Sequence, residues 1–466
     1  MPGSTLAPKR TEHDAFGPVE IAADRYWGAQ TQRALGVFEI GEERFPACLI
    51  HAFGLQKIAA ARANMRCGVL PAALADPIVA AAQELRDGRF DTHFPLPVWQ
   101  TGSGTQTNMN ANEVIANRAN ELLGQPLGTR SPVHPNNHVN ASQSSNDSFP
   151  TVMHVVTALE LRGRLLPALG ELEETLQGRA LAFADIAKIA RTHLMDAVPM
   201  TLGQSFDTFA RQVALGIDRL EATLPRLLAL PQGGTAAGTG LNAPPGFDRA
   251  FCEEITALTD LPFAPNPCKF EGMASHDALL EVSGALNVLA TSLLKIANDL
   301  RWLGSGPRCG LGEIQIPDDG LTSSIMPGKK NPTIAEALAQ ACMQVMGNHA
   351  TVTLANASGS FELNVAKPVL IHNVLQSIRV LGDASRVFGQ RFVAGVEADR
   401  RQLDANVRNA LLAITALNPH IGYDKVARIA AMALEQGLSP REAALASGFV
   451  DADTYDRIVG RQMRDA

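Results

Sequence analysis

The 466-residue sequence has few aromatic residues and no long uninterrupted apolar run. Aromatic residues make up 5% of the chain although hydrophobic residues make up 46%, so Leu, Ala, Val and Ile must fill the interior. This composition favours packed helices over a β-sandwich. No apolar run reaches the roughly 18 residues of a membrane-spanning helix, and the start of the chain has no apolar signal core. We therefore expect a cytoplasmic protein with no membrane partner.

Clustered positive charge and paired cysteines are also scarce. Lys and Arg number 40 against 47 Asp and Glu, which gives a formal net charge of −7, and no long basic run occurs. Nucleic acid is not an expected partner, because binding phosphates requires clustered positive charge. The six cysteines form no CxxC pair and lie far apart. We expect buried thiols in a reducing compartment, and neither a disulfide framework nor an iron–sulfur site.

Motifs for metals and nucleotides are missing too. The sequence contains no HExxH and no His/Cys cluster with the spacing of metal ligands. Around Gly328 the phosphate-loop pattern fails, because Ser323 stands where its first glycine belongs and Lys330 fills its Ser/Thr position. The stretch GGTAAGTG, residues 233–240, follows no strand of a βαβ unit and does not predict a dinucleotide site. We expect neither a metal nor an organic cofactor.

What the sequence has is long helical periodicity. The clearest segment runs from Asp277 to Leu303, with apolar residues at alternating steps of three and four. Similar segments are residues 152–189, 206–230, 334–352 and 365–393. Together they predict an all-α fold with a bundle of five long helices. Apolar residues extend beyond one face of these helices, so we expect a second copy of the chain to cover them.

The periodicity also suggests three domains. Residues 1–141 mix shorter helical patterns with Gly- and Pro-rich connections, and residues 142–400 contain the long helices. Residues 401–466 return to short helices, for example Pro440 to Ala446. We predict an N-terminal helical domain, a central bundle domain and a small C-terminal helical domain with these boundaries.

Four polar segments interrupt the apolar pattern: TGSGTQTNMNANE (101–113), HPNNHVNASQSSND (134–147), RTHLMDAVPMTLGQ (191–204) and SSIMPGKKNP (323–332). Their short hydroxyl and amide side chains suit the binding of a small anion. Each segment alone also has a structural interpretation: TGSGT as a capping turn, QSSND as a helix N-cap, and His193 as an interior histidine. Because a bundle brings the ends of its helices together, four such segments favour shared pockets for acid–base chemistry on a polyanion.

The segment SSIMPGKKNP resembles the SSIMPGKxNP signature of the fumarase/aspartase superfamily, and the other three resemble the class II fumarase versions of its motifs. The similarity extends from Ala23 through FELNVAKPV (361–369) to TALNPHIGYDKVA near the C-terminus. The resemblance implies a three-domain helical protomer, a homotetramer with a twenty-helix core, and active sites built from three subunits each. It also implies cofactor-free, reversible hydration of fumarate to L-malate, a step of the tricarboxylic acid cycle.

The resemblance assigns roles residue by residue. Ser323 would be the base that takes the C3 proton of malate, His193 would be the acid–base partner that handles water, and Glu336 would tune His193. The substrate carboxylates would be bound by Ser103, Gly104, Thr105, Ser144, Ser145, Asn146, Thr192, Ser324, Lys329, Lys330 and Asn331. A secondary anion site would comprise His134, Pro135, Asn136 and Asn137.

Departures from the family motifs keep alternatives open. The family loop commonly has glycine and valine where this chain has Thr322 and Lys330, and Lys330 supports a related lyase that eliminates ammonia or an amine from an aspartate-like substrate. His193 favours the hydratase, because imidazole titrates near neutrality. A non-catalytic scaffold is the third alternative, but no structural need explains all of the site residues together. At the secondary site, the family's HPND follows an arginine, whereas Asn137 replaces the aspartate here and Ser131 and Pro132 precede His134.

Overall fold

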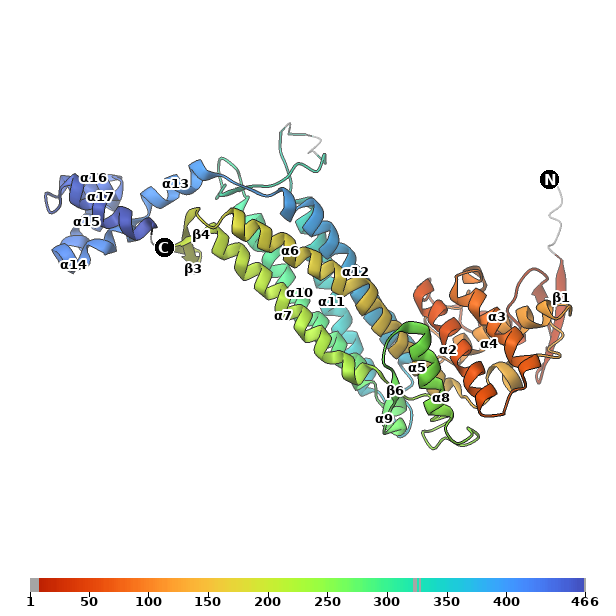
Figure 1. Ribbon diagram of the computed structural model, residues 1–466. Coiled ribbons are helices and arrows are strands. Elements are labelled where there is room, and N and C mark those ends of the chain that lie inside the picture. Colours follow the sequence, from red (N-terminus) through yellow and green to blue (C-terminus); the bar gives the residue numbers. More distant parts are fainter. Residues whose placement is uncertain (1–7, 322–324, 327, 465–466) are drawn as a thin grey trace, which may run out of the picture. The chain divides into compact units, whose positions relative to one another are not determined.

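The computed structural model describes residues 8–321, 325–326 and 328–464, and these residues are mostly helical (Figure 1). They form two compact units. The first unit comprises residues 1–165, 218–288 and 344–380, and the second comprises residues 166–217, 289–343 and 381–466. The predicted helical fold class is confirmed. The division into domains 1–141, 142–400 and 401–466 stays a prediction.

The first unit is built around one alanine-rich helix, α2 (Ala47–Arg66), which packs against α3, α5 and α8. Pro46 precedes its first turn and Gly68, with φ 73°, follows its end, as expected for helix boundaries. Most of α2 is buried because alanine lets neighbouring helices approach closely. The other short helices of this unit are α1 (Ala29–Val37), α3 (Ala72–Arg86), α4 (Thr105–Leu122), α5 (Ser145–Glu160), α8 (Phe247–Thr259) and α9 (Lys269–Ala274).

The five long helices follow the apolar periodicity. They are α6 (Leu166–Ala182), α7 (Leu202–Leu227), α10 (Asp277–Leu303), α11 (Thr333–Ala357) and α12 (Lys367–Arg391). Within the second unit, Gly216 of α7 lies against Leu289 of α10, and Gly389 of α12 lies against Leu172 of α6. By length and composition alone α10 could cross a membrane, but the core helix of a soluble protein passes the same test.

One predicted helix is divided in the structure. Residues 152–189 were expected as one helical segment, but α5 and α6 are joined by the π-helical turn η3 (Leu161–Leu165). The helix ends at Ala182, and residues 187–189 belong to a strand. Other short 3₁₀- or π-helical turns include η1 (Asp91–His93), η2 (Pro135–Val139) and η4 (Val393–Gly395).

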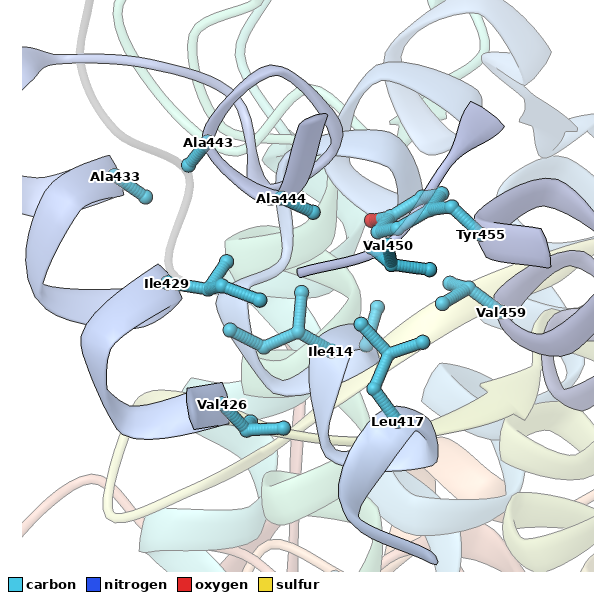
Figure 2. Packing of buried hydrophobic residues seen from close by; sticks show 11 residues of the cluster. Ile414, Leu417, Val426, Ile429, Ala433, Ala443, Ala444, Val450, Tyr455 and Val459 are labelled. Atoms are coloured by element: carbon cyan, nitrogen blue, oxygen red, sulfur yellow. The ribbon is translucent and has the colours of Figure 1, made fainter. Parts of the chain in front are cut away.

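Short helices pack around a separate apolar cluster near the C-terminus (Figure 2). The helices of this region are α13 (Arg400–Asn409), η5 (Leu411–Leu417), α14 (Asn418–Ile421), α15 (Tyr423–Gln436), α16 (Pro440–Ala446) and α17 (Ala452–Arg464). The cluster includes Leu417 and Ile429, both fully buried. Helix α16 has the predicted bounds because Ser439 and Glu442 form a capping box at its start.

The described residues also contain four small two-stranded sheets, which were not expected from the sequence. They pair β1 (Lys9–Asp14) with β2 (Gly17–Ala22), β3 (Ala187–Thr192) with β4 (Met195–Thr201), β5 (Ala229–Leu230) with β6 (Ala264–Pro265), and β7 (Ile314–Gln315) with β8 (Glu397–Ala398). Only β5 and β6 are parallel among these pairs. The expectation that the cysteines are buried is confirmed for Cys252 and Cys342 only, since Cys48 and Cys67 are partly buried and Cys268 and Cys309 are exposed.

Candidate active site

The first polar segment forms the turn that starts α4. Gly104 is the N-cap residue and has φ 76°, and an added Cβ would lie 2.2 Å from the Phe149 ring. An added Cβ on Gly102 would collide with the carbonyl oxygen of Val365. The turn therefore requires both glycines, one for close approach and one for its backbone angle. It holds Ser103, which is buried, with its hydroxyl 2.7 Å from that of Thr105.

The second segment caps α5 in the same unit. The Ser144 hydroxyl accepts a hydrogen bond from the Asn146 amide, and the Ser144 amide donates to Asp147, which completes a capping box. The other oxygen of Asp147 accepts from the amides of Gly233 and Thr235, each at 2.9 Å. The GGTAAGTG stretch thus supports the start of α5, and the Asn146 side chain also donates to the Ala236 carbonyl. Burial raises the pKa of Asp147 to about 6, although these backbone donors oppose the rise.

A side chain of α4 connects the two helix starts. The Asn108 amide nitrogen donates to the Ser145 hydroxyl oxygen at 2.9 Å. The interpretation of QSSND as a helix N-cap is confirmed, and TGSGT forms the turn at the start of α4, where the N-cap residue Gly104 has no side chain to cap the helix. Both helix starts are compatible with anion binding, because the first amides of a helix carry a partial positive charge.

The third segment forms a β-hairpin in the second unit, with His193 and Leu194 at its turn. These residues have φ 56° and 63°, the pair of positive angles that type I′ turns require. His193 and the preceding Thr192 are exposed, and Leu194 is 79% exposed. The alternative that His193 is an interior histidine is wrong.

A buried carboxylate holds strand β3 of this hairpin. Glu313 is fully buried and accepts from Arg191 at 2.5 Å and from the Asn406 side chain at 3.0 Å. Lys188 lies 3.7 Å away. Burial lowers the pKa of Lys188, while the charge of Glu313 opposes this shift. These contacts hold β3 in place, while the turn with His193 is exposed.

The fourth segment is described only in part. Ser323 and Ser324, together with Thr322, lie outside the described residues. Lys329 and Lys330 are exposed, Asn331 is partly buried, and Lys330 forms an ion pair with Asp318 at 3.1 Å. Glu336, in the first turn of α11, lies 3.8 Å from the Arg301 guanidinium.

The predicted secondary site surrounds the start of η2. The His134 ring accepts from the amides of Asn136 and Asn137, and its other nitrogen lies 2.9 Å from Arg130. An arginine does precede this motif, because Arg130, four residues before His134, contacts its ring. Burial, with the neighbouring charge of Arg130, lowers the pKa of His134. A cationic arginine beside a neutral histidine suits an anion.

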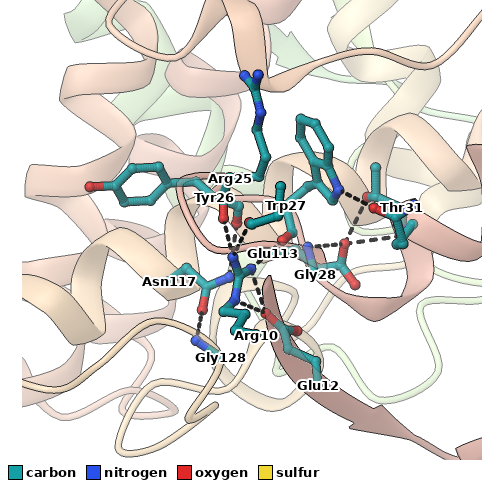
Figure 3. Close-up of polar contacts among 12 residues, drawn as sticks. Arg10, Glu12, Arg25, Tyr26, Trp27, Gly28, Thr31, Glu113, Asn117 and Gly128 are labelled. Carbon is teal, nitrogen blue, oxygen red and sulfur yellow. Dashed lines mark hydrogen bonds and ion pairs between the residues drawn. The ribbon is translucent and has the colours of Figure 1, made fainter. Parts of the chain in front are cut away.

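A cavity of about 370 Å³ joins this region to the start of α4. Its lining includes Thr105, Arg130 and Asn136, and also the buried Glu113. Glu113 accepts from the amides of Gly28 and Gln30 and from Thr31 (Figure 3). Burial raises the pKa of Glu113. The carboxylate holds the chain that leads into α1 and so closes one side of the cavity.

The predicted residues thus divide between the two units. The first unit supplies Ser103–Thr105, Ser144–Asn146 and His134–Asn137, and the second supplies Thr192, His193, Lys329–Asn331 and Glu336. In the described part of the chain, no group of three His, Cys, Asp or Glu side chains is placed to hold a metal ion.

Four residues that support the candidate site were not predicted to have a role in it, although Asn108 and Asp147 lie within two of the polar segments. They are Lys57, Asn108, Arg130 and Asp147. A signal existed for Lys57, since LQKIAAA places an ammonium in an apolar helical stretch, where a lysine is seldom buried without a partner.

Comparisons with known proteins extend over nearly the whole chain. Residues 17–347 match the family described as Lyase, and residues 414–462 match the family described as Fumarase C C-terminus. The chain is 54% identical to the mitochondrial fumarate hydratase of Rhizopus oryzae over 98% of this chain and 92% of that protein. It is also 54% identical to the class II fumarate hydratase of Rhizobium meliloti, over 97% and 98%.

Solved structures agree with the sequence relatives. A recombinant class II fumarase from Schistosoma mansoni matches with a TM-score of 0.94 and 40% identity, covering 98% of both chains. A fumarate lyase:delta crystallin from Brucella melitensis, bound to cobalt, matches with a TM-score of 0.95 and 39% identity, covering 98% of this chain and all of that one.

Proposed function

Because this chain belongs to the lyase family and matches class II fumarases over nearly its whole length, we infer that it is a fumarate hydratase. It is a hydro-lyase that adds water reversibly to fumarate to give L-malate. The observation that carries this conclusion is a sequence identity of 54% with fumarate hydratases over 97–98% of the chain. The tricarboxylic acid cycle is the process in which this reaction takes part.

The proposed mechanism begins with malate bound through its two carboxylates. The start of α4, with Ser103, Gly104 and Thr105, offers hydroxyl and amide donors to one anion. The start of α5, with Ser144, Ser145 and Asn146, offers a second set. Thr192, Ser324, Lys329, Lys330 and Asn331 complete the proposed binding residues. Prearranged donors are suited to the extra negative charge that develops when a carbon next to a carboxylate loses its proton.

Ser323 would take the C3 proton, breaking the C–H bond and leaving its electron pair delocalised into the adjacent carboxylate. His193 would then give a proton to the departing C2 hydroxyl, which leaves as water while the double bond forms. Hydration is the reverse of these steps. An ordinary serine is a weak base, so Ser323 requires activation by neighbouring donors and exclusion of water. Glu336 would tune His193 once the site is assembled.

The related lyase acting on an aspartate-like substrate receives less support. Lys330 was the feature that favoured it, and Lys330 has a partner in Asp318, 3.1 Å away. This ion pair accounts for the lysine without assigning it to a different substrate. His193, at a water-handling position, favours the hydratase.

We also propose that the protein is a homotetramer, in which each site draws residues from three subunits. The exposed apolar side chains of the β3–β4 hairpin, Leu194 at 79% and Val198 at 67%, support assembly, because such side chains are usually covered by a partner. We propose a cytoplasmic location; the relatives include a mitochondrial enzyme and bacterial ones.

Ultraviolet absorbance tests the function directly. Chelator-treated protein should remove the fumarate band when given fumarate and produce it when given L-malate. Aspartate and substituted succinates are the control substrates. Release of ammonia or an amine without malate turnover would contradict the hydratase and favour the related lyase. Activity that is lost on chelation and restored by a metal would contradict the cofactor-free mechanism.

A further inference from the structure

A lysine lies buried beneath the two helix starts in the first unit. Lys57 of α2 is fully buried, and its ammonium donates to three amide oxygens: Asn108 at 2.9 Å, Gln143 at 3.0 Å and Asn140 at 3.2 Å. An ammonium has three hydrogens, so every donor of Lys57 has an acceptor. Burial of a cation costs free energy, and an apolar side chain of similar volume usually packs there at lower cost. Lys57 therefore invites a functional explanation.

The direction of these hydrogen bonds sets the orientation of Asn108. Because its side-chain oxygen accepts from Lys57, its amide nitrogen must point the other way. That nitrogen donates to the Ser145 hydroxyl oxygen at 2.9 Å and to Asn140 at 3.2 Å. The Ser145 oxygen thus accepts a bond from inside the protein, which leaves the hydroxyl hydrogen available to an external acceptor.

We propose that Lys57 is a positioning residue for the substrate: acting through Asn108, it makes the Ser145 hydroxyl a donor to a substrate carboxylate. The proposal rests on the assignment of Ser145 to substrate binding above. Lys57 also adds positive charge beneath α4 and α5, whose N-termini already favour anions. A dianionic substrate therefore stabilises the charged form of this lysine, and the charged form strengthens binding.

Lys57 does not act as the partner of an ion pair, because the side chains that accept its hydrogen bonds are neutral amides. Asp147 of α5 is the titratable group whose charge acts on Lys57, while the side chains in contact from α4 and from the loop before α5 are neutral amides. Burial lowers the pKa of Lys57 to about 7, and Asp147 partly opposes this shift. Asp147 is already occupied by the amides of Ser144, Gly233 and Thr235. Lys57 consequently acts on the amide network.

The first test is Lys57→Met, which keeps the length of the side chain and removes the charge. We expect KM for fumarate to rise about tenfold or more, the effect of losing an oriented hydrogen bond to a charged group, with kcat changed much less. The matched control is Asn64→Leu, a buried polar residue on the same helix that contacts Ala141 and Ser142. The control removes structural hydrogen bonds of the same helix and should leave KM near the wild-type value.

A double-mutant cycle tests the path through Asn108. If Lys57 acts through Asn108, then Asn108→Leu alone raises KM, and adding Lys57→Met changes it little further. Additive effects, or an unchanged KM in folded Lys57→Met protein, would overturn the proposal. An inactive wild-type enzyme would instead refute the proposed function, so the two failures are distinguishable.

A second measurement applies even if Lys57→Met does not fold. Binding of succinate, a non-reacting dicarboxylate, is measured by calorimetry between pH 6.5 and 9 in His193→Asn protein, which lacks the hairpin imidazole. Affinity should fall as pH rises through about 7, because the buried lysine loses its proton. A flat profile would overturn the proposal.

Discussion

His193 has a left-handed backbone conformation, which most residues other than glycine seldom adopt. It lies in the turn of the β3–β4 hairpin, two residues after Arg191, which pairs with the buried Glu313. The φ of 56° at His193 suits Asn as well, because asparagine is enriched in the left-handed region. His193→Asn should therefore preserve the turn while removing the titratable group. We expect turnover of fumarate to fall by about 10²-fold or more, with an unchanged circular dichroism spectrum.

The matched control for this variant is His420→Asn, which changes an exposed histidine of α14. The control should retain wild-type turnover. Near-normal activity in His193→Asn would remove this residue from the mechanism. Ser323→Ala should show a loss of similar size if the serine is the base.

A second histidine, His154, should make the free energy of unfolding depend on pH. His154 of α5 is buried, with its Nδ1 2.7 Å from the Leu227 carbonyl oxygen, and burial lowers its pKa to about 4. Since the folded-state pKa lies below the unfolded value of 6.5, the unfolded chain binds the proton more readily between these values. His154 thus contributes stability above pH 6.5 that is lost as pH falls toward 4, about 2 kcal/mol of it by pH 5.

This pH dependence can be isolated in a variant. His154→Gln keeps an amide donor for Leu227 and has no proton to gain. The drop in Tm between pH 7 and pH 5 should be smaller in His154→Gln than in the wild type. Equal drops in the two proteins would show that His154 does not titrate in this range.

At the scale of elements, long helices were predictable and the small sheets were not. The apolar repeat of α10 runs without interruption from Asp277 to Leu303, so its bounds followed from the sequence. The β3–β4 hairpin lacks the Asn-Gly or Gly-containing turn that usually marks a type I′ hairpin. His193 and Leu194 take the positive angles instead, and nothing local in the sequence indicates this.

The candidate site was also predictable only in part. Binding residues lie in recognisable motifs, but Lys57 lies in α2, 51 residues before Asn108 and still further from Asn140 and Gln143. Its role depends on tertiary contacts between α2, α4 and the loop before α5. A lysine in a helical stretch is usually exposed, so periodicity cannot reveal such contacts.

The start of α4 offers a test of how tightly this element is fixed. In Gly104→Ala the new Cβ would lie 2.2 Å from the Phe149 ring, and the residue would keep its positive φ. We expect a loss of roughly 2–4 kcal/mol in the free energy of unfolding, from backbone strain and overpacking together. KM for fumarate should rise as well, because Ser103 and Thr105 are displaced.

Gly68→Ala is the matched control for Gly104→Ala. Gly68 has φ 73°, and no atom lies within 4 Å of an added Cβ, so only the backbone cost of about 1 kcal/mol remains. Both variants can be compared by thermal denaturation and fumarate kinetics. Equal losses of stability would show that contact with Phe149 does not restrict the turn.

At the scale of the whole molecule, the proposed site residues are divided between the two units of the chain. We therefore expect activity to depend on the assembly of several subunits, if the proposed shared site is right. One half of the proposed site lies on the helix starts around Ser145, and the other half includes the exposed hairpin with His193. If each site draws these halves from different subunits, two inactive variants can complement each other. The predicted mass of the assembly is four times the 49.6 kDa of one chain, which light scattering can measure.

Complementation between Ser145→Ala and His193→Asn tests this shared site. Each variant alone should lose most of its activity, the second by about 10²-fold or more. When the two are unfolded together and reassembled, some sites receive an intact serine from one subunit and an intact histidine from another. Activity in the mixture should then exceed that of either variant reassembled alone, and the gain should depend on mixing before assembly. A mixture no more active than its parents, in tetramers that contain both chains, would mean that Ser145 and His193 in each site come from the same subunit.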